Sequence, residues 1–150
     1  MLIMLEKIFL GEKKDDIKLQ EVSSLSLAFL GDAVWTLLVR EYLLEQTTYK
    51  NTTLHKLSTQ FVKASYQAKF FDKIEDGLCQ EEFLIAKRAR NCKMTTMAKH
   101  ATYVDYKKAT SLEALIGYYY LTNQFEKIEK LNQLLIIDIK NCLQNNKQNN

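Results

Sequence analysis

The chain has 150 residues, enough for one domain and too few for two independent ones. It contains no proline and only four glycines, and because both residues interrupt helices, their scarcity predicts an all-α fold with long helices rather than a strand-and-turn architecture. The net charge is +3, which is too small to indicate a nucleic-acid partner by itself.

Cysteine usage and hydropathy indicate the compartment. Cys79, Cys92 and Cys142 are far apart and odd in number, which fits a reducing cytosol better than a disulfide framework. The apolar run at residues 1–5 is short and Glu6 follows it directly, so we do not expect a signal peptide. No stretch approaches the roughly 18 apolar residues of a membrane span. We therefore expect a cytoplasmic protein without a membrane partner.

Residues 1–21 are predicted to be a lead-in to the first main helix. Residues 24–45 are apolar on nearly all sides, which predicts a helix at the centre of a bundle. After a polar break, apolar residues recur at steps of three and four over residues 54–71, which indicates one amphipathic helix. The other face of that helix is polar and carries Lys56, Lys63 and Gln67.

The second half of the chain begins with a predicted turn around Gly77 and a helix over residues 81–90, with acids first and bases last. Residues 91–109 show no clear period, which predicts a long loop. Helices are expected over residues 111–121 and 125–143. The polar residues 144–150 are predicted to be disordered, so the domain is assigned to residues 22–143.

Positive charge is concentrated in one segment. Residues 87–108 contain seven basic side chains and one acid, Asp105, whereas the whole chain has a net charge of only +3. The remainder of the chain is therefore slightly acidic. A basic stripe on an acidic body is the electrostatic pattern of a site for a polyanion.

Two acids stand in apolar surroundings beside glycines. Asp32 lies in the most apolar run of the chain, where an unpaired buried carboxylate would have to take up a proton or bind a cation, and Gly31 precedes it. Glu113 lies in another apolar run, with Gly117 on the same helix face. Two helices that cross at these glycines would bring the acids together, and carboxylates are ligands for hard cations such as Mg²⁺.

A structural interpretation of each acid stays open at this level. Gly31 and Asp32 fit a helix break followed by an N-cap aspartate. Thr110 and Glu113 fit a capping box, in which the glutamate reaches back to the cap N–H group. These interpretations explain each acid separately but explain neither the glycines nor the basic segment.

Four segments, taken in order, carry a family resemblance. Residues 27–34, Leu-Ala-Phe-Leu-Gly-Asp-Ala-Val, resemble the signature helix of ribonuclease III domains, and residues 113–121 are similar to their second catalytic helix. Residues 54–68 resemble the middle helix, and residues 87–93 the basic loop segment, of the Mini-ribonuclease III family, which lacks an appended double-stranded-RNA-binding domain. The similarity covers about residues 22–135.

The resemblance implies a ribonuclease III catalytic-domain-like helical bundle that forms a homodimer through the signature helix, with two sites in one RNA-binding valley. It implies that Asp32 and Glu113 are the catalytic residues and bind Mg²⁺, Asp32 being the best catalytic candidate. Contacts with the RNA backbone are assigned to Lys87, Arg88, Arg90, Asn91 and Lys93. The dimer contact is assigned to Phe29, Leu30 and Trp35. For Trp35, the alternative is that its side chain packs in the core of its own chain.

The chain departs from full-length ribonucleases III at two positions of the site. Those enzymes carry glutamate where Ala28 stands and aspartate where Thr110 stands, and the Mini family resembles this chain in lacking both. Two acids are then left to hold the metal. Ala89 also stands where the basic segment of the family has glycine.

The sequence thus predicts a magnesium-dependent endoribonuclease that cuts double-stranded RNA and leaves 5′-phosphate and 3′-hydroxyl ends. The resemblance implies a role in maturing precursor 23S ribosomal RNA, with a ribosomal protein on the substrate as a further partner. One alternative is a ribosomal-RNA-binding protein of the same fold that does not cut. Another is a helical interaction protein whose apolar helix serves dimerisation alone. The presence of both acids favours the enzyme.

Overall fold

The computed structural model describes residues 21–46, 48–93 and 102–148, and these ranges contain helices and no strand. The helices are α2 (Ser24–Glu45), α3 (Asn51–Val62), α4 (Ala64–Ile74), α5 (Gln80–Arg90), α6 (Tyr103–Leu121) and α7 (Phe125–Gln148), with a 3₁₀ turn, η2 (Glu75–Gly77), after α4. The predicted all-α fold is confirmed. No helix in the described ranges has both the length and the apolar character needed to cross a bilayer.

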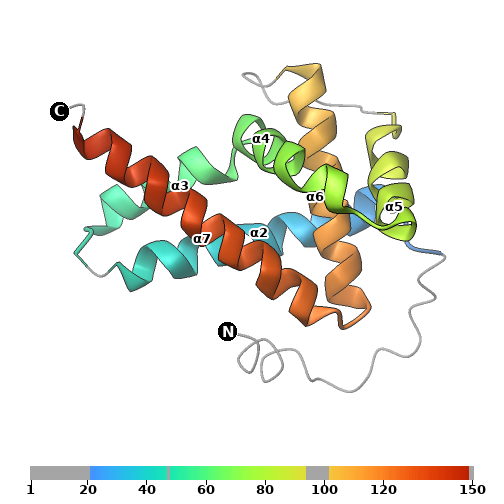
Figure 1. Ribbon diagram of the computed structural model, residues 1–150, viewed down its shortest axis with the longest axis horizontal. Helices are drawn as coiled ribbons and strands as arrows, with labels where there is room; N and C mark the ends of the chain where they lie inside the picture. Colours follow the sequence, from blue (N-terminus) through green and yellow to red (C-terminus); the bar gives the residue numbers. More distant parts are fainter. Residues whose placement is uncertain (1–20, 47, 94–101, 149–150) are drawn as a thin grey trace.

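Helices α2 and α6 cross at the centre of the molecule, with α4 and α5 packed on α6 (Figure 1). The Ser23 hydroxyl caps α2 by accepting a hydrogen bond from the Ser26 N–H group, and Thr102 caps α6 in the same way. Both helices are apolar around most of their circumference, which is why they occupy the core. The core side chains include Trp35, Phe70, Phe71, Leu112, Leu115, Ile128 and Leu135.

The crossing of α2 and α6 is a contact of backbone with backbone. A Cβ atom on Gly31 would lie 1.7 Å from the carbonyl oxygen of Glu113, and a Cβ atom on Gly117 would lie 2.0 Å from the carbonyl oxygen of Leu27. Each helix therefore offers a glycine to the backbone of the other. The prediction that two helices cross at these glycines is confirmed.

The segment predicted as one amphipathic helix is two helices. Lys63 has extended backbone angles, φ −72° and ψ 150°, so α3 ends at Val62 and α4 begins at Ala64. The carbonyl group of Phe61 lies in the last turn of α3, where it has no partner within the helix, and the indole N–H group of Trp35 donates to it at 2.9 Å. A hydrogen bond from α2 thus stabilises a helix end that the apolar pattern does not reveal.

Trp35 belongs to the core of its own chain. Its side chain is fully buried and packs edge-on against Phe70, with 5.0 Å between the ring centroids. The assignment of Trp35 to a dimer contact is therefore wrong, because no part of the ring reaches the surface. The alternative role, in the core, is confirmed.

Two helix bounds also differ from the sequence prediction. α6 begins at Tyr103, so the end of the segment predicted as a loop, residues 91–109, is helical. The Thr102 cap supplies the start signal, through its bond with the Asp105 N–H group. α7 continues to Gln148, into residues 144–150, for which the sequence predicts disorder.

The variant Gly31→Ala tests the backbone contact. Its methyl group would overlap the Glu113 carbonyl group, so the two helices would have to separate. We expect the free energy of unfolding to fall by roughly 3 kcal/mol or more, the upper end of the usual cost of overpacking. Urea denaturation followed by circular dichroism measures the loss.

Gly77→Ala is the matched control, since a Cβ atom there meets nothing within 4 Å. Its stability should stay within about 0.5 kcal/mol of the wild-type value. Equal stability of the two variants would show that the crossing does not depend on glycine.

Candidate active site

Asp32 and Glu113 line one pocket at the crossing of α2 and α6. The pocket has a volume of about 670 Å³ and takes its walls from α2, α6 and the start of α4. Its lining residues are Leu25, Ala28, Phe29, Asp32, Val62, Lys63, Ala64, Ser65, Gln67, Tyr106, Ala109, Thr110 and Glu113. Asp32 directly follows the glycine that contacts the Glu113 backbone, so the helix crossing itself brings the two acids together.

The structural interpretations of the two acids are wrong. α2 runs unbroken through Gly31 and Asp32, so Asp32 does not cap a helix. Thr110 lies inside α6 and its hydroxyl donates to the Tyr106 carbonyl group at 2.9 Å, so Thr110 and Glu113 do not form a capping box. Both acids are interior helix residues with no capping role.

The two carboxylates differ in their environment. Asp32 is exposed and Glu113 is half-buried, so the costly buried acid is Glu113, where the sequence indicated Asp32. Burial raises the pKa of Glu113 to about 8, and the negative charge of Asp32 adds to the rise, whereas the side-chain amide of Gln67 opposes it. Near neutral pH without a cation, Glu113 therefore holds a proton in most molecules.

The donor set fits a hard divalent cation. Mg²⁺ is usually held by one or two carboxylates, with water and substrate phosphate as its other ligands. A cation between Asp32 and Glu113 would offset both the cost of burying the Glu113 charge and its repulsion by Asp32. The described residues hold no group of three or more His, Cys, Asp or Glu side chains suited to a metal, and Ala28 and Thr110 line this pocket without adding charge.

The start of α4 gives the pocket a wall suited to an anion. Because α4 begins afresh after Lys63, its first bonds run from the N–H groups of Tyr66 and Gln67 to the Lys63 carbonyl, each at 3.1 Å. The N–H groups of Ala64 and Ser65 come before these bonds and have no partner within the helix. A helix N-terminus favours negative charge, so this wall and Lys63 are suited to a phosphate group.

Gln67 is the pocket residue that the sequence analysis placed wrongly. The helical period assigned it to the polar outer face of one long helix, but it is 1% exposed. The break at Lys63 changes the phase of the helix, so residues after it no longer follow the face assigned from residues before it. No signal in the sequence marks this break.

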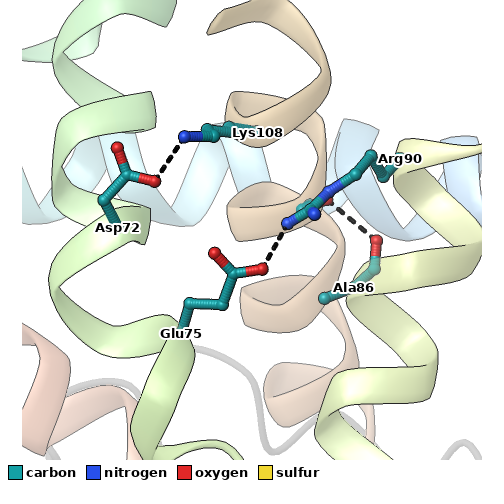
Figure 2. A network of polar contacts seen from close by, with 6 residues as sticks. Asp72, Glu75, Ala86, Arg90 and Lys108 are labelled. Carbon is teal, nitrogen blue, oxygen red and sulfur yellow. Dashed lines mark hydrogen bonds and ion pairs between the residues drawn. The ribbon is translucent and has the colours of Figure 1, made fainter. Parts of the chain in front are cut away.

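The basic segment has an outward part and an inward part. Lys87, Arg88, Asn91 and Lys93 are exposed at the C-terminal end of α5 and just beyond it. Arg90 is half-buried, and its predicted contact with RNA stays a prediction. Its guanidinium group donates to Glu75 at 2.7 Å (Figure 2). The same group lies over the ring of Phe71.

Contacts beside the pocket fasten α4 and α5 to the rest of the fold. Lys108 of α6 donates to Asp72 of α4 at 2.6 Å, and Arg90 joins α5 to the end of α4 (Figure 2). The Ser111 hydroxyl donates to the Ala86 carbonyl group at 2.8 Å. These contacts join α4 to α6, which both carry pocket walls, and join α5 to both of them. Lys99, part of the predicted basic segment, lies outside the described residues.

An exposed apolar stripe runs along α2 next to the pocket. The Phe29 side chain is 84% exposed although it is large and apolar, and Leu25 and Leu37 are also exposed. Leu30, the other residue assigned to a dimer contact, is half-buried. Apolar patches of this kind mark contact surfaces. The dimer contact of Phe29 and Leu30 stays a prediction.

Comparison with known proteins finds consistent matches across this region. The family model described as Ribonuclease III domain matches residues 25–124. Mini-ribonuclease 3 of Clostridium tetani is 39% identical over 97% of each chain, and a Mini-ribonuclease 3-like protein of Fusobacterium nucleatum is 42% identical over 79% of this chain and 91% of its own. An X-ray crystal structure of a protein from Fusobacterium nucleatum matches with a TM-score of 0.74 and 40% identity, covering 85% of this chain and 98% of that one.

Glu113→Gln is predicted to stabilise the protein at alkaline pH. The ordinary pKa of 4.5 rises to about 8 in the folded state, so the folded state binds more protons than the unfolded state between these values. The free energy of unfolding therefore falls as pH rises through this window. The variant avoids that loss, and we expect a gain of roughly 2–4 kcal/mol at pH 8 that disappears near pH 4.5.

Thermal unfolding in EDTA from pH 4.5 to pH 8.5 measures this gain. The control is Glu126→Gln, which replaces an exposed glutamate at the start of α7. A gain of equal size in the control, or none in Glu113→Gln, would contradict the costly burial of Glu113.

Proposed function

Because the chain belongs to the Mini-ribonuclease 3 family of ribonuclease III domain proteins and is an endoribonuclease of that type, we propose that it cuts double-stranded RNA with Mg²⁺ held between Asp32 and Glu113. The observation that carries the proposal is the meeting of these two acids at the glycine crossing, in a pocket that also holds a helix N-terminus. Acids of this kind need a cation, and the adjoining wall suits a phosphate group.

The two acids and the wall formed by the start of α4 then have separate tasks in phosphodiester hydrolysis. Asp32 and Glu113 bind the cation from two different helices, and Lys63 and the start of α4 orient the scissile phosphate. Bound Mg²⁺ supplies charge neutralisation on the phosphate and lowers the pKa of the attacking water. No side chain has to act as a covalent nucleophile. The expected products carry 5′-phosphate and 3′-hydroxyl ends.

The outward basic residues serve RNA binding. Lys87, Arg88, Asn91 and Lys93 contact the RNA backbone, and this contact is sensitive to salt because cationic side chains displace condensed counterions. Arg90, which is partly exposed, is also assigned to this contact, and its bond with Glu75 holds the end of α5 in place. Double-stranded RNA is recognised through shape, phosphates and 2′-hydroxyl groups, so we expect little base specificity.

A homodimer would place two such sites on one duplex. Leu25, Phe29 and Leu37 offer an apolar stripe on the outside of α2, and a two-fold contact pairs a surface with its own copy. Leu25 and Phe29 also line the pocket, so burial of the stripe would shape the pocket edge. Each subunit would then cut one strand.

The proposed substrate is precursor 23S ribosomal RNA, on which a bound ribosomal protein would be a further partner. This assignment rests on the family resemblance, and the three free thiols are compatible with the cytoplasm as the place of action. The alternative is a ribosomal-RNA-binding protein of the same fold that does not cut. Such a protein has no use for two acids placed together in one pocket, so the geometry favours the enzyme.

A cleavage assay with Asp32→Asn tests the proposed function. A long, perfectly paired RNA is incubated with wild type or variant, in Mg²⁺ or in EDTA. Wild type should give fragments with 5′-phosphates in Mg²⁺ alone, and Asp32→Asn should lose at least about 100-fold in rate because a metal ligand is missing. Native gels should show that the variant still binds the duplex.

Asp76→Asn is the matched control, because Asp76 is an exposed aspartate in η2 outside the pocket. It should cut at the wild-type rate. If the wild-type protein in Mg²⁺ binds both a duplex and a structured ribosomal precursor but cuts neither, the result would instead support the non-cutting protein.

A further inference from the structure

Gln67 is a pocket residue to which the proposed function gives no task. Its side chain is 1% exposed although it belongs to the pocket wall, one turn after the start of α4. Among the described residues, no group accepts a hydrogen bond of good geometry from its Nε2 atom. A buried donor without a partner is destabilising, so stability alone does not account for an amide at this position.

Helix α4, which carries Gln67, packs directly on α6, which carries Glu113, and both side chains line the same pocket. Part of the surrounding wall is apolar, as with Ala28, Val62 and Ala109. Glu113 is therefore an acceptor in the same pocket to which the unpaired Nε2 atom of Gln67 can donate.

A glutamate in a wide pocket needs such a restraint. Its side chain has several rotatable bonds, and a volume of about 670 Å³ leaves it room to turn away from Asp32. Gln67 sits on a helix that the Lys108–Asp72 and Arg90–Glu75 ion pairs hold in place (Figure 2). Outer hydrogen bonds of this kind orient the residues that bind metals in proteins.

We propose that Gln67 is a positioning residue whose buried side-chain amide holds the Glu113 carboxylate toward Asp32, so that one divalent cation can bind both acids. The inference rests on the proposed function, since it assigns Gln67 a part in the same cation site. Gln67 does not touch the RNA in this account. It acts through Glu113, and its loss affects cation binding before it affects RNA binding.

The test measures cation binding by the full-length protein without RNA. Mn²⁺ is the probe, and the free ion is counted by electron paramagnetic resonance in wild type and in Gln67→Leu, which keeps the volume and removes the amide. We expect the Kd for Mn²⁺ to rise about 10-fold or more, the usual effect of losing an outer partner of a metal ligand. The Kd for duplex RNA in EDTA should change less than about twofold, a split that general damage to the fold would not produce.

Asn132→Leu is the matched control, since Asn132 is another buried amide, on α7 and not among the residues that line the pocket. It should bind Mn²⁺ like wild type. If Gln67→Leu does not fold, Gln67→Asn carries the test, because its side chain is one methylene shorter and withdraws the amide from Glu113. Weakened Mn²⁺ binding by the folded variant supports the proposal, and wild-type affinity overturns it.

Asp32→Asn separates failure of this inference from failure of the proposed function. If wild type does not bind Mn²⁺, or Asp32→Asn binds it equally well, the cation site itself is refuted and the positioning role with it. If wild type binds, Asp32→Asn does not, and Gln67→Leu binds like wild type, the cation site stands and the positioning role of Gln67 alone is overturned.

Discussion

The close approach of two helix backbones at Gly31 and Gly117 is the constraint on which the rest of the structure depends. Each glycine lies where a Cβ atom would overlap a carbonyl group of the other helix. The contact fixes which turns of α2 and α6 meet, and Asp32 and Glu113 belong to those turns. The pocket and its two acids therefore follow from the same backbone contact that holds the centre of the fold.

The position of Glu113 lowers the stability of the folded state and places two acids in one pocket. Glu113 is half-buried beside another acid, and burial and the Asp32 charge together raise its pKa to about 8. A protein selected for stability alone gains nothing from such a pair, whereas the proposed cation site requires it. The neighbouring helix N-terminus and Lys63 extend the same proposal to a phosphate group.

The sequence was sufficient to predict the features that depend on spacing. Gly31 beside Asp32, and Gly117 one turn after Glu113, predicted both the crossing and the position of the two acids in one pocket. The features it did not reveal depend on contacts between distant segments. Trp35 donates a hydrogen bond to the end of α3, and the helix that follows has a different phase, which buries Gln67. The ion pair with Glu75 draws the Arg90 side chain inward. Helical periodicity describes one segment at a time, so it cannot predict contacts between distant segments.

Stabilisation of the RNA-free protein by Mg²⁺ tests most directly whether Asp32 and Glu113 form a single cation site. A cation that binds the folded state raises Tm, so each protein is compared in Mg²⁺ and in EDTA. Wild type should gain in Tm, while Asp32→Asn, Glu113→Gln and the double variant should all lose the same gain, because one ion needs both acids. If each single variant kept about half of the gain and only the double variant lost it all, the two acids would act independently and the shared site would be contradicted.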